Sequence, residues 1–224
     1  MSPANCNSIA SSISIIKARP DHAAGMADCH LIAFGGRFMT EMGFRWLRAL
    51  YRFFINHSGG VCYVAVNPAG QVVGFAAGGQ PEIRERFLRY AVPRYPHILV
   101  WKFVTRSLVR TVLLEELAKK LKLKRSTVSS GNIPEQKAGD ACGNLLSICV
   151  LPDFKGTGVA GKLIETFQKA CAEKGYRHLR LSVVSANSRA IAFYKKHLWY
   201  EMGASGESTK FALDINNNLS DLNQ

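Results

Sequence analysis

Two periods of apolar residues alternate along the chain, one typical of strands and one typical of helices. Short apolar runs predict strands at 13–17, 61–66, 71–77, 144–151 and 178–184, with two shorter strands near 199–203 and 208–214. Helical spacing of apolar residues predicts helices at 20–34, 40–55, 158–174 and 188–197. Such alternation favours a single α/β domain, which we expect over residues 12–214, with flexible termini at 1–11 and 215–224.

The alternation is interrupted over residues 81–141. This segment contains a short charged helical pattern near 82–91, a longer amphipathic one near 97–123 and a polar loop from Ser126 to Asp140. Residues 81–137 hold 13 basic and five acidic side chains, and so carry +8 of the net charge of +13. We therefore expect a basic helical insertion within the domain.

The charge balance favours an anionic partner, which could be a nucleotide cofactor, a nucleic acid, an acidic glycan or a membrane surface. Specific nucleic-acid binding is disfavoured because the basic residues are not interleaved with exposed aromatic ones. The six cysteines show no CxxC spacing and no Cys/His cluster, which predicts no metal site and a reduced, cytoplasmic protein. The N-terminal residues do not resemble a secretion signal. Charged residues also interrupt the most apolar stretch, 98–117, so it is a poor membrane span.

A glycine-rich loop follows the strand at 144–151 and opens directly into a helix. Its glycines are Gly156, Gly158 and Gly161. The first backbone N–H groups of a helix have no partner within the helix, and they lie at the positive end of its dipole. Glycines allow a large anion to approach these groups closely. The loop therefore predicts a site for a phosphate or pyrophosphate.

Two other phosphate-binding patterns fit the loop less well. A Walker A loop would need Ser or Thr at position 163, where the chain has Leu163. Residues 156–161 match the dinucleotide pattern GxGxxG literally, but the next strand, 178–184, contains no acidic residue to bind a ribose. The hypothesis of a nicotinamide-dependent dehydrogenase is therefore supported by the glycine pattern alone.

The wider sequence resembles the GNAT superfamily of acetyltransferases. Residues 155–160 resemble its motif A, [Q/R]xxGx[G/A], with Lys155 in place of Gln or Arg. The segment from Val183 to Gly203, which includes Asn187, Ala190, Phe193 and Tyr194, is similar to the second conserved segment of that family. The resemblance is strong over 143–214, weaker over 13–80 and absent over 81–141. It implies a mixed, splayed central sheet flanked by helices, the GNAT fold.

In the family, two parallel strands separate and the pantetheine arm of acetyl-coenzyme A lies between them. The resemblance implies that the strands 144–151 and 178–184 do so here, and that acetyl-coenzyme A is the cosubstrate. Backbone groups of Ile148 to Val150 would bind the arm, and the amides from Lys155 to Gly161 would hold the pyrophosphate. The residues expected to bind the cofactor are Ile148, Cys149, Val150, Lys155, Gly156, Thr157, Gly158, Val159, Ala160, Gly161, Asn187, Ala190 and Phe193.

The resemblance also implies the reaction, which is attack of a neutral amine on the thioester carbonyl. Tyr194 matches the position of a family tyrosine close to the thioester sulfur, so we expect it to donate a proton to the departing thiolate. A backbone N–H near Val150 would stabilise the charge that develops on the carbonyl oxygen. No general base is evident. Glu41, Glu82 and His30 are candidates on the acceptor side, but we interpret each of them as a surface group.

The insertion follows the third strand, on the side where family members admit the acceptor. Lys102, Arg106 and Arg110 are spaced by four and form a basic stripe on the predicted helix. We therefore expect a small-molecule amine acceptor that is anionic or part of an amino sugar. A contact with the membrane surface is less favoured, because basic residues at the end of a helix are explained by its dipole. Protein N-acetylation, a non-catalytic acyl-coenzyme A-binding module and a homodimer remain open alternatives.

Overall fold

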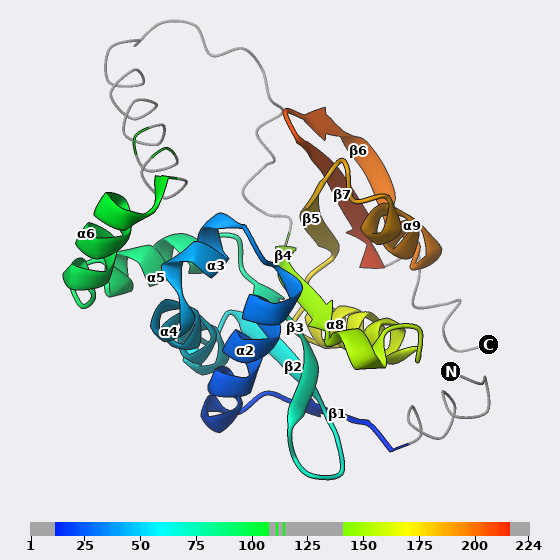
Figure 1. Ribbon diagram of the computed structural model, residues 1–224. Coiled ribbons are helices and arrows are strands. Elements are labelled where there is room, and N and C mark those ends of the chain that lie inside the picture. Colours follow the sequence, from blue (N-terminus) through cyan, green and yellow to red (C-terminus); the bar gives the residue numbers. More distant parts are fainter. Residues whose placement is uncertain (1–11, 108–110, 112–113, 115–140, 216–224) are drawn as a thin grey trace, which may run out of the picture.

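The computed structural model describes residues 12–107, 111, 114 and 141–215 (Figure 1). Its centre is one seven-stranded sheet with the strand order β1-β2-β3-β4-β5-β7-β6. Neighbouring strands are antiparallel except for β4 and β5, which are parallel. The strands are β1 (Ser14–Lys17), β2 (Gly60–Val66), β3 (Val72–Gly79), β4 (Cys142–Val150), β5 (His178–Val184), β6 (Tyr200–Ser205) and β7 (Ser208–Asp214).

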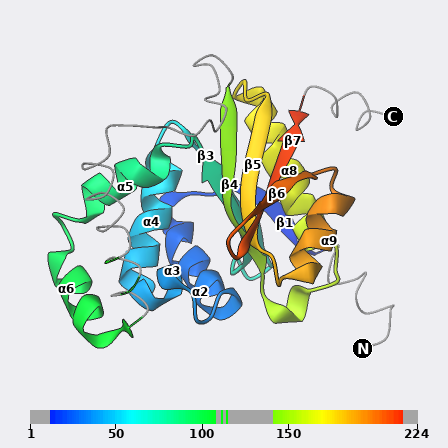
Figure 2. The same ribbon diagram turned by 90° about the horizontal axis from the view of Figure 1, so that it is seen from above.

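Helices cover both faces of this sheet (Figure 2). The helices are η1 (Pro20–His22), α2 (Ala23–Ala33), α3 (Phe38–Met42), α4 (Phe44–Asn56), α5 (Ile83–Ala91), α6 (Pro96–Thr105), η2 (Pro152–Phe154), α8 (Val159–Glu173) and α9 (Ser188–Lys196). Side chains alternate across β2, so Val61 and Ala65 join the core under α8, whereas Cys62 and Val64 join the core under α2 and α4. The sheet therefore separates two apolar cores.

The mixed sheet and its flanking helices confirm the fold class expected from the sequence. Two helices differ in their bounds from those predicted from the sequence. The helix expected at 40–55 is divided into α3 and α4 at Gly43, whose φ of 87° is in the left-handed region. The helix expected at 97–123 is interrupted after α6 at Arg106, which has extended backbone angles, and the described residues 107, 111 and 114 are again helical. Most of its remaining residues lie outside the described part of the chain.

The expected termini fall mostly outside the described residues, as does the polar loop from Ser126 to Asp140. Residue 215 is an exception, because Ile215 is buried in the core and its N–H donates to the Arg177 carbonyl at 2.9 Å. The packed domain thus extends one residue beyond its expected end.

The sheet opens between β4 and β5. β5 pairs with β7 along its whole length, but it pairs with β4 only where residues 142–144 face residues 178–180. Just beyond that point β4 contains a bulge, since Gly78 pairs with Leu145 and Ala77 with Ser147, which leaves Leu146 without a partner in β3. A bulge bends and twists its strand, so β4 leaves β5 here and a gap follows.

Candidate active site

The edge of β4 that borders the gap carries backbone groups without a strand partner. Leu151 N–H donates to the Val73 carbonyl at 2.8 Å, which makes these two residues a hydrogen-bonded pair. Hydrogen-bonded and non-hydrogen-bonded pairs alternate along antiparallel strands. In the observed register, Ile148 and Val150 therefore direct their N–H and C=O groups into the gap. The same alternation directs the backbone of Cys149 toward Phe75, so its expected backbone contact with a cofactor does not fit this geometry.

The loop that follows β4 presents a row of free amides. The N–H groups of residues 156–161 donate to no protein group within the described residues. Gly156 and Gly158 have φ of 83° and 81°, which glycine adopts without strain. The Lys155 amide differs from the expectation, because it already donates to the Pro152 carbonyl at 3.1 Å. Six free amides, rather than the seven expected from Lys155 to Gly161, thus surround the first turn of α8.

Space lies open in front of the first two glycines. A Cβ atom added to Gly156 or Gly158 would meet no heavy atom within 4 Å. Gly161 differs, because a Cβ there would lie 3.3 Å from Cε1 of His197. Gly161 therefore allows α8 and α9 to pack closely, whereas Gly156 and Gly158 leave an accessible cradle of amides.

Unpaired lysines add positive charge near the cradle. Lys155 and Lys162 are exposed, and neither forms an ion pair with another described residue. Lys195, by contrast, lies 3.3 Å from Glu201. The first two lysines thus remain available to an anion bound at the start of α8.

If Lys155 contacts a bound phosphate, Lys155→Ala should weaken coenzyme A binding about 5-fold, since exposed ion pairs contribute roughly 1 kcal/mol. Lys155→Arg should keep most of the affinity. Isothermal titration calorimetry with coenzyme A measures both, and Lys169→Ala, further along α8, is the matched control. Equal losses for Lys155→Ala and Lys169→Ala would mean that only net charge matters.

Helix α9 holds the second group of expected site residues. Asn187 caps the helix, because its Oδ1 accepts a hydrogen bond from the Ala190 N–H at 3.1 Å. Phe193 is half-buried, and its ring centroid lies 4.6 Å from that of His197. The direct role that the structure gives Asn187 is therefore to orient α9, which carries Ala190, Phe193 and Tyr194.

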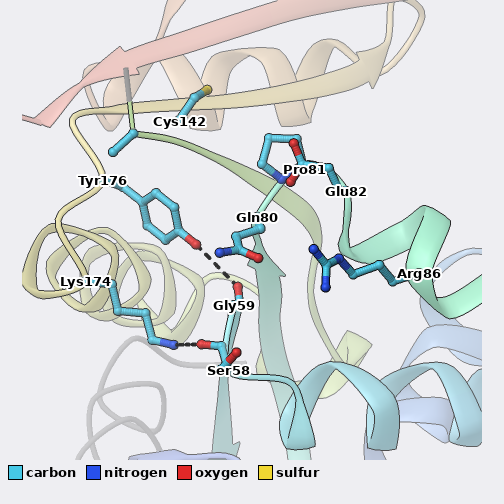
Figure 3. Close-up of a pocket in the computed structure, with 10 residues that line it drawn as sticks. Ser58, Gly59, Gln80, Pro81, Glu82, Arg86, Cys142, Lys174 and Tyr176 are labelled. Carbon is cyan, nitrogen blue, oxygen red and sulfur yellow. Dashed lines mark hydrogen bonds between the residues drawn. The ribbon is translucent and has the colours of Figure 1, made fainter. Parts of the chain in front are cut away.

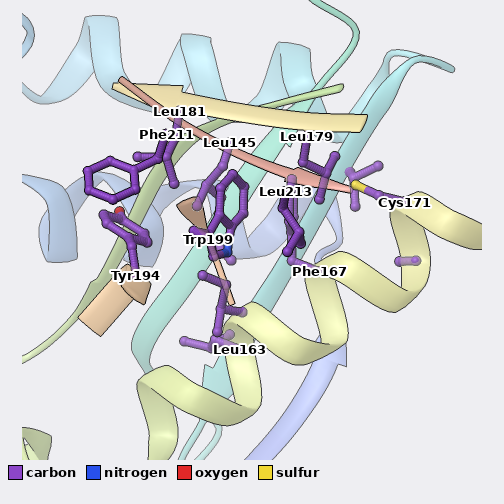
Figure 4. Packing of buried hydrophobic residues seen from close by; sticks show 14 of the residues in the cluster. Leu145, Leu163, Phe167, Cys171, Leu179, Leu181, Tyr194, Trp199, Phe211 and Leu213 are labelled. Atoms are coloured by element: carbon purple, nitrogen blue, oxygen red, sulfur yellow. The ribbon is translucent and has the colours of Figure 1, made fainter. Parts of the chain in front are cut away.

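Tyr194 extends from α9 toward the sheet and packs against two aromatic rings (Figure 4). Its ring centroid lies 6.0 Å from those of Trp199 and Phe211, and the residue is only 9% exposed. Burial disfavours the phenolate and raises the pKa of Tyr194 to about 12. The hydroxyl therefore stays protonated at neutral pH and can act as a donor.

The sequence analysis interpreted Glu41, Glu82 and His30 as surface groups. The structure corrects this interpretation for one of the three. Glu82 is exposed, as expected. Glu41 is half-buried, and its Oε2 lies 3.2 Å from Nε of Arg106. His30 is not a surface group, because it is only 5% exposed and its Nδ1 lies 2.6 Å from Oη of Tyr51. Sequence periodicity alone gave no signal for this contact, since Tyr51 belongs to a different helix.

A cavity of about 590 Å³ lies beside the C-terminal end of α8, whereas the amide cradle lies at the N-terminal end of that helix (Figure 3 shows the cavity). It is found where β3 ends and β4 begins, beside the C-terminal end of α8, and Tyr176 Oη donates there to the Gly59 carbonyl. Its lining residues are Ser58, Gly59, Gln80, Pro81, Glu82, Arg86, Ala141, Cys142, Lys174 and Tyr176. None of them is among the site residues expected from the sequence. The described residues also contain no cluster of metal-ligating side chains and no helix long and apolar enough to cross a membrane.

A comparison of the chain with known protein families gives the class of protein to which this open sheet and amide cradle belong. The sequence model of the acetyltransferase (GNAT) family matches residues 27–198, which is most of the chain. The chain therefore belongs to the GNAT acetyltransferase family.

Individual relatives agree with this assignment. The uncharacterized N-acetyltransferase YjcF of Bacillus subtilis is 36% identical over 58 residues, a match that covers 26% of this chain and 39% of that protein. Among solved structures, SsHAT is similar with a TM-score of 0.60, 24% identity and coverage of 91% of this chain and 98% of SsHAT. At these levels of identity, solved structures support the fold alone.

Two further structures are similar at lower identity. PaiA N-acetyltransferase from Thermoplasma acidophilum, in complex with coenzyme A, has a TM-score of 0.56, 14% identity and coverage of 91% of this chain and 99% of PaiA. Mutant forms of the spermidine/spermine N-acetyltransferase SpeG from Vibrio cholerae have a TM-score of 0.55, 11% identity and coverage of 95% and 99%.

Proposed function

We propose that this protein transfers an acetyl group from acetyl-coenzyme A to the primary amine of a small molecule. The observation that carries the proposal is the row of six free amides at the start of α8, next to the gap between β4 and β5. Unpaired amides at a helix N-terminus attract a diphosphate, and an opened sheet edge accepts an extended chain of amides. Family membership supports the same reaction.

The described residues fit coenzyme A both at its pyrophosphate and along its pantetheine arm. The amides of residues 156–161 and the open space at Gly156 and Gly158 suit its pyrophosphate. The unpaired N–H and C=O groups of Ile148 and Val150 suit the amides of its pantetheine arm. When bound, acetyl-coenzyme A supplies an activated acyl carbon. The similar PaiA structure, which contains coenzyme A, agrees with this assignment.

The chain itself supplies hydrogen-bond donors to the reaction. Val150 directs its N–H into the gap, where it would donate to a carbonyl oxygen that gains negative charge. Tyr194, as a protonated phenol, would donate to a departing thiolate. Each donor would hydrogen-bond to an atom on which negative charge develops during the reaction.

Binding and turnover test the proposal separately. We expect coenzyme A and acetyl-coenzyme A to raise the melting temperature by several degrees, because a ligand at about 100 times its Kd stabilises the folded state by roughly 2.7 kcal/mol. We expect NAD to leave it unchanged. A rise with NAD and none with either coenzyme would contradict the proposal. Coenzyme A release, followed with a thiol reagent, then measures turnover with spermidine, glucosamine, glucosamine 6-phosphate and a lysine-containing peptide.

The same panel tests the charge of the acceptor. Of the basic stripe expected on one helix, Lys102 lies on α6, whereas Arg106 has extended backbone angles beyond the end of α6 and pairs with Glu41, so the two do not share a continuous helix face. Arg110 lies outside the described residues. We propose that glucosamine 6-phosphate is a better acceptor than glucosamine, and that added salt narrows the difference, since screening weakens the attraction of the phosphate. Equal rates for the two sugars, or peptide acetylation alone, would contradict a small anionic acceptor.

A further inference from the structure

Helix α6 exposes an apolar face to solvent. On its inner side, Ile98 and Leu99 pack against the core under α2 and α4. On the opposite side, Val100, Trp101 and Val104 are 64%, 66% and 66% exposed. Val104 follows Val100 by four residues and Trp101 by three, so the three side chains share one face of the helix. We call these three residues the outer face of α6.

More exposed apolar side chains lie on the hairpin that α5 and α6 form. Half of the large exposed apolar side chains that the structure describes fall within residues 88–104, and they are Leu88, Tyr90, Val92, Val100, Trp101 and Val104. Both ribbon views place α6 at the margin of the molecule, on the side away from β5 and β7 (Figures 1 and 2). Clustered exposed apolar side chains mark interaction surfaces, so we expect a partner to cover this hairpin.

The charge of the hairpin indicates which kind of partner fits. Residues 82–107 hold six basic and two acidic side chains, and α6 contains no acidic residue. Arg84, Arg86 and Arg94 are exposed and form no ion pair with another described residue. Two copies of a chain with a net charge of +13 would repel each other, whereas an anionic surface would attract this hairpin.

We propose that the outer face of α6 docks the protein onto the surface of an anionic phospholipid bilayer. Amphipathic helices at such a surface bury apolar side chains at the level of the head groups, where tryptophan is favoured, while nearby basic side chains are attracted to anionic lipids. Trp101 and the two valines supply the apolar part, and the unpaired arginines supply the charge. The sequence alone made a membrane contact the less favoured interpretation, but it did not show that this face is exposed.

Tryptophan fluorescence reports on the outer face alone. The chain has three tryptophans, and Trp46 and Trp199 are only 1% and 2% exposed. Vesicles of phosphatidylcholine and phosphatidylglycerol in equal parts should therefore shift the emission to shorter wavelength and reduce its quenching by acrylamide, because Trp101 leaves water. Vesicles of phosphatidylcholine alone should have little effect, and added salt should weaken the effect of the anionic vesicles. The shift should disappear in Trp101→Phe.

Co-sedimentation with the same anionic vesicles measures the binding itself. Trp101→Ala combined with Val104→Ala should bind about 10-fold more weakly or less, because burial of even one large apolar side chain contributes roughly that factor. Trp101→Phe remains apolar and should keep most of the binding. The matched control is Ile32→Ala combined with Met202→Ala, which truncates two similarly exposed side chains outside the hairpin and should bind like the native protein. All these residues are exposed, so each variant should keep the native melting temperature.

Several results would overturn the proposal. If native protein did not bind the anionic vesicles, or bound neutral ones equally well, an anionic bilayer would not be the partner. Equal binding by the native protein and the Trp101→Ala, Val104→Ala variant would assign membrane binding to another segment. A native dimer that this variant converts to a monomer in analytical ultracentrifugation would mean that a second copy covers the outer face. No assay here requires coenzyme A or an amine, so the outcome is independent of the proposed acetyl transfer.

Discussion

Gly156→Asp is expected to bind coenzyme A about 50-fold more weakly than Gly156→Asn. A Cβ at this position meets no heavy atom within 4 Å, so either side chain can be accommodated in the free protein. Asn and Asp also tolerate the φ of 83° better than most residues. The carboxylate would lie beside the six free amides, in the place proposed for the pyrophosphate. At an effective dielectric of about 20, repulsion between charges some 6 Å apart costs about 2–3 kcal/mol.

Comparing the two variants isolates charge from size, since the side chains are nearly isosteric. Gly156→Ala serves as the control for strain and should lose little affinity. Calorimetric titration with coenzyme A gives the three dissociation constants, and the difference between Asp and Asn should shrink as salt is raised. Equal affinities for the Asp and Asn variants would place the pyrophosphate elsewhere on the molecule.

Tyr194→Phe is expected to lower kcat about 100-fold while leaving coenzyme A affinity unchanged, because a positioned proton donor typically contributes roughly 10²–10⁴ in rate. The variant should fold normally, since the Tyr194 hydroxyl forms no hydrogen bond with another described residue. With the pKa of Tyr194 raised to about 12 by burial, the phenol remains protonated below that pH. The ratio of the wild-type to variant kcat should therefore stay constant from about pH 6 to pH 10.

Tyr200→Phe is the control for this experiment. Tyr200 lies on the exposed strand β6, and its hydroxyl donates to Oδ2 of Asp214 at 3.3 Å. Removal of this hydroxyl should therefore not affect kcat. A Tyr194→Phe variant with the turnover of the native protein would remove Tyr194 from the mechanism. A fall in the ratio of wild-type to variant kcat between pH 6 and pH 10 would indicate a phenol that ionises far more readily than its burial implies.

Features that depend on neighbouring residues could be predicted from the sequence. The strand His178–Val184 was predicted with the same bounds as observed, because Leu179, Leu181 and Val183 alternate with polar residues, which is the local period of a strand. The amide cradle was likewise predictable, since free N–H groups are a property of any helix N-terminus. Conversely, a local pattern misjudged the helix at 40–55, where it gave too little weight to Gly43.

Features that depend on distant partners could not be predicted in this way. The pairing of β4 with β3 decides that Ile148 and Val150, rather than Cys149, offer their backbone groups to the gap. The contact between His30 and Tyr51 joins two helices, and so a histidine that resembles a surface residue in the sequence is buried.

By itself the sequence thus determined the succession of helices and strands, and the glycine-rich entry to α8, because each is set by contacts within a few residues. The tertiary structure alone decided where the sheet opens, which backbone groups border the opening and which polar side chains meet in the core. Those features arise from strand register and from the packing of helices on a sheet face, which bring together residues far apart in the chain.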